Sequence, residues 1–242
     1  MERTLFLAGA TGAIGSRLAP LLIAEGWRVV GMTRDPDKAA RLRARGIAAA
    51  VLDVFDADAL ITAVAAAKPA VVIHQLTDLP PALDPARMAE ATARNARIRE
   101  EGTRNLVEAA IRAGARRFIA QSVAFAYADG PTPHTEEDAL AVTAEGRAGV
   151  SARGVASLEV QTLTAPLDGA VLRYGRLYGP GTGFDAPAGP APLHVDAAAK
   201  AAIQVLAQGA RGIYNFAEDD GVVSSEKAKR DLHWSADWRS TP

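Results

Sequence analysis

Apolar runs and amphipathic stretches alternate along this chain from one end to the other. The short apolar runs predict strands, and the longer stretches, with apolar positions three or four residues apart, predict helices. Strands separated by helices are typical of βαβ units, whose parallel sheet is covered on both faces. The pattern therefore predicts an α/β fold with a doubly wound parallel sheet. The expected strands are Thr4–Ala8, Arg28–Thr33, Ala48–Leu52, Ala70–His74, Arg116–Ser122, Ala170–Tyr174 and Gly212–Phe216.

Capping residues, prolines and glycines mark the ends of the expected helices. Asp35 followed by Pro36 is a good helix start, because the aspartate caps free N–H groups and proline fits the first turn. Glycines and prolines interrupt both periodicities between residues 179 and 192, which predicts an irregular surface loop near the ligand. The expected helices run from Pro36 to Arg45, from Asp56 to just before Pro69, over Ala86–Ala113 and over Ser151–Thr164.

The first expected strand ends in a glycine-rich turn that leads directly into a helix-like stretch. Three glycines stand there in the spacing G-x-x-G-x-x-G. Such a turn needs one glycine where the backbone reverses and another where a diphosphate comes close, and the ligand then meets free N–H groups at the positive end of the helix dipole. A flexible glycine-rich turn is the alternative, but its position favours a Rossmann-type dinucleotide site. The residues expected to contact the cofactor are Gly9, Thr11, Gly12, Ala13, Ile14 and Gly15.

The end of the second strand bears on the choice between NAD and NADP. An acidic residue at this place binds the free ribose 2′-hydroxyl of NAD. Here the strand ends in Thr33 and Arg34, without a carboxylate. A guanidinium suits a 2′-phosphate, so Arg34 favours NADP, with NAD as a possibility and an ordinary surface arginine as the alternative. Arg17 is a candidate to assist the same phosphate.

Composition narrows the class of partner. The formal net charge is −1 without a block of like charges, which argues against binding to nucleic acid or to an anionic membrane and favours a small-molecule substrate. The chain has no cysteine, and its histidines and carboxylates lack metal-ligand spacing, so no metal site is expected. No targeting or membrane-spanning segment is evident, which predicts a cytoplasmic protein.

The chain resembles the short-chain dehydrogenase/reductase superfamily on its extended or atypical side, near the NAD-dependent epimerase/dehydratase proteins. The resemblance covers most of the chain and implies a single NAD(P)-binding Rossmann domain over 1–242, with a small substrate-side portion formed by about 175–242. The motifs that carry it are the glycine turn, Leu52-Asp53-Val54, Val72-Ile73-His74, Glu101 to Ala110, Ser122, and Leu172-Arg173-Tyr174 leading to Tyr178-Gly179-Pro180.

This resemblance implies further cofactor residues. Asp53 would contact the adenine, and Val54 would add a backbone contact. His74, Gln75 and Leu76 would line the path to the nicotinamide. Tyr174 is expected to form part of the wall of the nicotinamide site. The long helix and the helix from Ser151 form the dimer face in many relatives, which implies a homodimer.

The catalytic half of the resemblance is incomplete. Relatives that move a hydride usually pair a tyrosine with a lysine four residues later, which lowers the pKa of the phenol, and place a serine on the neighbouring strand. Ser122 matches that serine, and Tyr127 is the phenol nearest to it in sequence; these two are the catalytic candidates. No Tyr-x-x-x-Lys exists in the chain, and Ser151 and Val155 fall where the pair belongs.

Two functions therefore remain open. One is an NADP(H)-dependent oxidoreductase or epimerase-like enzyme acting on an unknown small molecule. The other is a catalytically silent NADP(H) sensor or scaffold protein, which the missing pair favours. Fold-level resemblance alone does not decide between them.

Overall fold

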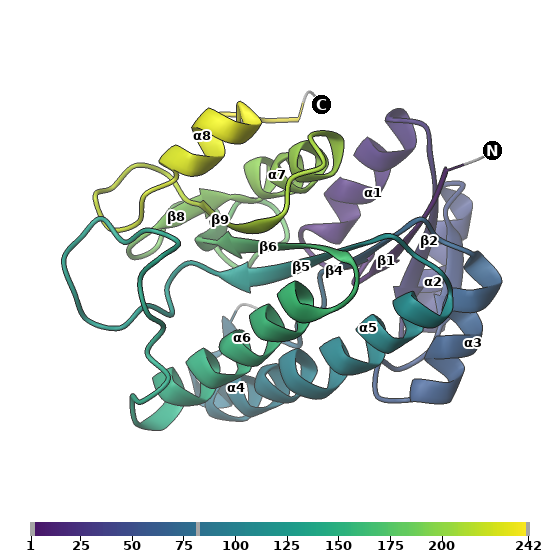
Figure 1. The fold of residues 1–242 in the computed structure, drawn as a ribbon, viewed down its shortest axis with the longest axis horizontal. Helices are drawn as coiled ribbons and strands as arrows, with labels where there is room; N and C mark the ends of the chain where they lie inside the picture. The colour runs from purple at the N-terminus through teal and green to yellow at the C-terminus, as the bar shows by residue number, and fades with distance from the viewer. Residues whose placement is uncertain (1–2, 81–82, 241–242) are drawn as a thin grey trace.

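The computed structural model describes residues 3–80 and 83–240. Its centre is a seven-stranded parallel sheet with the order β3-β2-β1-β4-β5-β6-β9 (Figure 1). All seven predicted strands are present, and their ends differ from the expected ones by at most two residues. The strands are β1 (Arg3–Ala8), β2 (Trp27–Thr33), β3 (Ala48–Val51), β4 (Val71–His74), β5 (Arg117–Val123), β6 (Asp168–Tyr174) and β9 (Gly212–Phe216).

Helices cover both faces of the sheet, as the alternating pattern predicted. Strand β1 shows why: Leu5 and Leu7 pack in the cluster under α1 and α7, whereas Phe6 and Ala8 pack in the cluster under α3 and α5. All four side chains are fully buried. The helices are α1 (Gly15–Ala24), α2 (Pro36–Ala44), α3 (Ala57–Ala67), α4 (Met88–Arg97), α5 (Thr103–Arg112), α6 (Gly146–Thr164), α7 (Val195–Ala207) and α8 (Glu226–Leu232).

The long helix predicted over Ala86–Ala113 is present but is not uniform. A short 3-10 turn over Pro85–Arg87 precedes α4, and a π-helical turn over Ile98–Gly102 joins α4 to α5. A π turn contains one residue more than an α-helical turn, and such turns occur often at functional sites. Because the apolar periodicity continues through the extra residue, the sequence pattern predicted one helix.

The C-terminal part differs most from the expectation. Helices α7 and α8 lie where the pattern predicted no helix, and α6 begins at Gly146 rather than at Ser151. A small second sheet pairs β7 (Arg176–Tyr178) with β8 (Pro192–His194) across the predicted irregular loop. Within the described ranges, no helix combines the length and apolarity that crossing a membrane requires.

Candidate functional site: a cleft at the carboxyl ends of the strands

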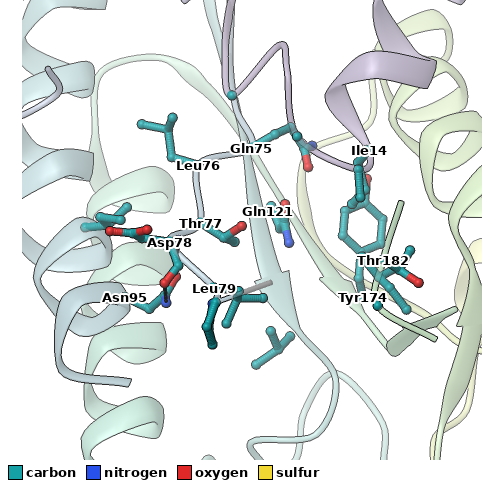
Figure 2. Close-up of a pocket in the computed structure, with 18 of the residues that line it drawn as sticks. Ile14, Gln75, Leu76, Thr77, Asp78, Leu79, Asn95, Gln121, Tyr174 and Thr182 are labelled. Atoms are coloured by element: carbon teal, nitrogen blue, oxygen red, sulfur yellow. Dashed lines mark hydrogen bonds between the residues drawn. The ribbon is translucent and has the colours of Figure 1, made fainter. Parts of the chain in front are cut away.

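A cleft of about 960 Å³ opens at the carboxyl ends of the parallel strands. It lies where the strand order reverses between β1 and β4, the place at which open α/β sheets bind ligands. Figure 2 shows Ile14, Gln75 and Tyr174 on one side and the segment from Thr77 to Leu79 with Asn95 on the other, with Gln121 between them. The cleft thus joins the glycine turn to the ends of β4, β5 and β6.

The glycines of the turn have separate physical roles. Gly9 has φ +89°, and a Cβ there would lie 2.5 Å from the carbonyl oxygen of Gln75. A Cβ on Gly15 would lie 2.1 Å from the carbonyl oxygen of Gly9, so Gly15 lets the helix approach the turn. A Cβ on Gly12 would meet only ordinary contact at 3.4 Å, while Gly12 itself faces the cleft.

The turn has free donors for an anion. The N–H groups of Ala13 and Ile14 make no hydrogen bond within the described ranges, and both residues line the cleft at the start of α1. Such N–H groups at a helix N-terminus bind phosphate. The absence of a side chain at Gly12 and the two free N–H groups fit a dinucleotide diphosphate, which would lie against Gly12, Ala13 and Ile14.

Arg34 lies at the rim of the cleft with more than half of its side chain exposed. Its guanidinium is 3.9 Å from a carboxylate oxygen of Asp53 and 3.6 Å from one of Asp78. Both distances exceed those of a hydrogen bond, so its donors stay available to a ligand. The 2′-phosphate contact remains a prediction.

Asp53 and Val54 follow β3 and line the same end of the cleft. The Asp53 carboxylate accepts a hydrogen bond from the N–H of Phe55 at 3.0 Å, which fixes the turn. The Val54 carbonyl accepts one from the Asn105 side chain at 3.0 Å. The structure therefore brings both residues to the wall where adenine is expected.

The three residues predicted at the end of β4 do not all line the cleft. Gln75 and Leu76 line the cleft, but the His74 side chain is 1% exposed and lies outside its lining. His74 Nδ1 accepts the N–H of Leu76 at 3.2 Å, and the ring packs edge-on against Phe118. Burial, assisted by the charge of Arg99, lowers the pKa of His74 to about 3, so the ring is neutral. His74 shapes the turn rather than lining the path.

The wall beyond Leu76 is fixed by hydrogen bonds to α4. Asn95 accepts the N–H of Asp78 and donates to its carbonyl, both at 3.0 Å. Arg94 donates to the Asp78 carboxylate at 3.1 Å.

On the opposite wall Tyr174 is buried, and burial raises the pKa of its phenol well above its usual range. Its hydroxyl is neutral and adjoins Gln75.

Ser122 and Tyr127 lie in a buried polar network outside the cleft lining. The Ser122 hydroxyl donates to Glu159 at 2.7 Å, and Glu159 is held by two hydrogen bonds from Arg173, at 2.7 and 2.8 Å. The Tyr127 hydroxyl donates to Asn215 at 2.6 Å and accepts from Arg173 at 2.9 Å. Burial outweighs the nearby Arg173 and raises the pKa of Tyr127.

The network has a consequence for the expected chemistry. Neither hydroxyl of the two catalytic candidates is free, and the raised pKa of Tyr127 is the opposite of what a phenol needs to transfer a proton near neutral pH. Their catalytic role remains a prediction, and their placement favours a structural one.

Ser151 lines the cleft, at the position where the resemblance places the tyrosine. Its hydroxyl accepts a hydrogen bond from Arg99 at 3.1 Å, and Arg99, in the π turn, also lines the cleft. Val155, at the lysine position, is fully buried and apolar. The part of the cleft where the resemblance places the tyrosine therefore holds Ser151 and the Arg99 side chain, which comes from the π turn.

Most predicted cofactor residues therefore meet in one cleft, and five sequence candidates lie outside its lining: Gly15, Arg17, His74, Ser122 and Tyr127. Arg17 pairs with Asp196 at 2.9 Å, so it is not placed to assist a 2′-phosphate. Arg99, Gln121 and Asn95 are cleft residues that sequence reasoning missed. The predicted residues that line it are Gly9, Thr11, Gly12, Ala13, Ile14, Arg34, Asp53, Val54, Gln75, Leu76 and Tyr174.

Comparisons with known proteins agree with this geometry. A family described as NAD(P)H-binding matches residues 9–183. A Streptomyces protein named 3-diazoavenalumate denitrifying reductase is 40% identical over 92% of this chain and 78% of its own length.

Solved structures show the same fold at low sequence identity. UDP-glucose 4-epimerase from Thermotoga maritima superposes with a TM-score of 0.78 at 17% identity, over 98% of this chain and 94% of the other. A yeast methylglyoxal/isovaleraldehyde reductase complexed with NADPH gives a TM-score of 0.74 at 14% identity, over 96% and 93%. The predicted Rossmann fold and resemblance to epimerase/dehydratase proteins are confirmed.

Proposed function

The chain belongs to the NAD(P)H-binding family of Rossmann proteins, and on this premise we propose that it is an NADPH-dependent reductase that removes nitrogen from a diazonium compound. The reaction type and substrate class come from the name of the Streptomyces relative. The observation that carries the proposal is the position of the missing pair, where Ser151 lines the cleft in place of the tyrosine and Val155, in place of the lysine, is buried outside the cleft lining.

This chemistry needs no acid at that wall. When bound, the nicotinamide supplies a hydride, and the balanced change is R–N₂⁺ plus hydride giving R–H and N₂. The C–N bond breaks, its electron pair leaves with N₂, and a C–H bond forms, so no proton enters or leaves. A carbonyl reduction, by contrast, must deliver a proton to the oxygen, which is the task of an acidic phenol.

The protein's own residues bind and orient the reactants. Backbone N–H groups at Ala13 and Ile14 would hold the diphosphate, and Arg34 would bind the 2′-phosphate of NADP. Tyr174 and Gln75 both line the cleft. Because burial raises the pKa of the Tyr174 phenol, this phenol stays neutral and donates no proton. Binding in a fixed orientation provides most of the rate for a transfer of this kind.

The test is turnover with a diazonium salt of an aromatic carboxylate. NADPH oxidation is followed by absorbance, and N₂ is measured by mass spectrometry from a ¹⁵N-labelled substrate. The expected result is one N₂ per NADPH, with simple aldehydes and ketones reduced far more slowly.

A matched control keeps the fold and removes the cofactor contact. The Gly12→Ala variant meets only ordinary contacts in the protein, but its methyl group faces the cleft. It should lose turnover and NADPH binding together. Tight NADPH binding by the wild type without turnover of either substrate class would overturn the proposal in favour of the silent sensor. Faster reduction of carbonyls would overturn the assigned substrate class.

A further inference from the structure

Arg99 is a cation inside the cleft that the cofactor half does not use. It stands in the π turn between α4 and α5 and lines the cleft, where its guanidinium donates to the Ser151 hydroxyl. The adenosine end is expected to use Arg34, which lines the cleft beside Asp53. Arg99 therefore faces the part of the cleft left for a substrate.

The guanidinium has donors to spare. A guanidinium carries five N–H donors, and within residues 3–80 and 83–240 the one hydrogen bond that the Arg99 side chain makes is to the Ser151 hydroxyl at 3.1 Å. No carboxylate of the described residues lies within ion-pair distance of it. Glu159, whose charge favours the charged form of Arg99, is already bound by Arg173 and Ser122.

The surroundings make this arrangement costly unless an anion completes it. Burial lowers the pKa of Arg99 to about 10, although the attraction of Glu159 opposes the change. Arg99 is partly buried and has no counter-charge within ion-pair distance among the residues that the structure describes, and an oxyanion that accepts two of its N–H groups would gain strong, oriented hydrogen bonds. The guanidinium remains charged at neutral pH, so it is ready for such a partner.

The walls near Arg99 indicate what else the ligand contains. Met88, Ile98, Val123 and Phe125 line the same cleft, and Phe125 is 41% exposed beneath the Arg176 guanidinium. An apolar body, a conjugated or aromatic one above all, suits these surfaces. The cleft thus combines these apolar surfaces with two cations, Arg99 and Arg176, of which Arg176 already lies over the Phe125 ring.

We propose that Arg99, held in place by Ser151, binds an oxyanion of an apolar substrate, a carboxylate or a phenolate, and so orients the substrate in the cleft. The identity of the reacting group rests on the proposed function, but the anion site does not. Ser151 then acts as a positioning residue: its hydroxyl occupies one donor of Arg99 and leaves the others directed at the ligand.

The test measures binding without turnover. The probes are cinnamate and the uncharged cinnamamide, titrated calorimetrically into the NADPH-loaded protein. The wild type should bind the carboxylate at least about tenfold more tightly than the amide, as expected for charge-assisted hydrogen bonds. Arg99→Met should abolish this preference, and Arg99→Lys should restore part of it, because lysine keeps the charge but not the planar fork.

A matched control and a separate assay keep the outcomes distinct. Arg97→Met removes an exposed arginine two residues away that pairs with Glu101 outside the cleft, and it should leave the preference unchanged. Equal binding of the two probes by the wild type, or a preference that survives in Arg99→Met with an unchanged melting temperature, would overturn the inference.

Turnover of the diazonium carboxylate is assayed in parallel. A carboxylate preference without N₂ release leaves the anion site standing and rejects the proposed function. N₂ release without any carboxylate preference rejects the anion site alone.

Discussion

The two ends of the cleft present different kinds of groups to a ligand: backbone groups at the glycine turn and side chains near Ser151. The glycine-turn end presents backbone: the close approach of Gly9 to Gln75, and the free N–H groups of Ala13 and Ile14. The Ser151 end presents side chains, and the serine that the resemblance marks as catalytic points away into a buried ion pair. A site built from backbone N–H groups depends little on the identity of the surrounding side chains, whereas a site built from side chains is altered by one substitution.

The largest expected effect comes from the backbone end. Gly9→Ala puts a Cβ against the Gln75 carbonyl at a positive φ, where neither neighbour is a flexible side chain. We expect a loss of about 3–5 kcal/mol in the free energy of unfolding, measured by urea denaturation, with NADPH binding lost. Gly12→Ala should keep nearly all of the stability. Equal losses in the two variants would contradict the division of roles between the glycines.

The buried network should respond almost as strongly, but in stability rather than in binding. Glu159→Gln leaves the Arg173 cation, 3% exposed, without its counter-charge. We expect the free energy of unfolding to fall by about 3–5 kcal/mol. NADPH affinity of the folded variant should stay within about twofold of the wild type. Glu108→Gln, which breaks an exposed pair with Arg112, should cost less than about 0.5 kcal/mol.

Arg34→Ala tests the rim of the cofactor end. Loss of charge-assisted hydrogen bonds to a 2′-phosphate should weaken NADPH about ten- to hundredfold and leave NADH nearly unchanged, as measured by calorimetry. Arg41→Ala, on the exposed side of α2, provides the control. If the ratio of the two affinities does not move, Arg34 is the surface arginine of the alternative interpretation.

Ser122→Ala gives the smallest expected effect on activity and decides the catalytic prediction. Its hydroxyl is bound to Glu159, so removal should cost about 1–2 kcal/mol of stability and change kcat less than about threefold. A fall in kcat of a hundredfold or more at unchanged NADPH affinity would establish Ser122 as catalytic. It would also remove the contrast between the two ends of the cleft.

The sequence predicted the sheet and the glycine turn because both rest on local rules. Buried parallel strands are apolar on both faces, as Leu5 and Phe6 are, and a glycine spacing reports directly on backbone shape. The paired contacts of the chemical end join residues far apart in the chain, such as Arg99 with Ser151 and Ser122 with Glu159. No local pattern encodes such pairs, so the sequence identified Ser122 by resemblance and missed Arg99.

The π turn over Ile98–Gly102 sets the rotational phase of the long helix. Each residue of a helix turns the chain by about 100°, so one extra residue shifts everything before it relative to everything after it. Deleting a residue there would let α5 keep its place on the sheet while Arg99 swung out of the cleft. Ligand specificity in this fold could therefore change through a single insertion or deletion, without a new side chain and without a new element of structure.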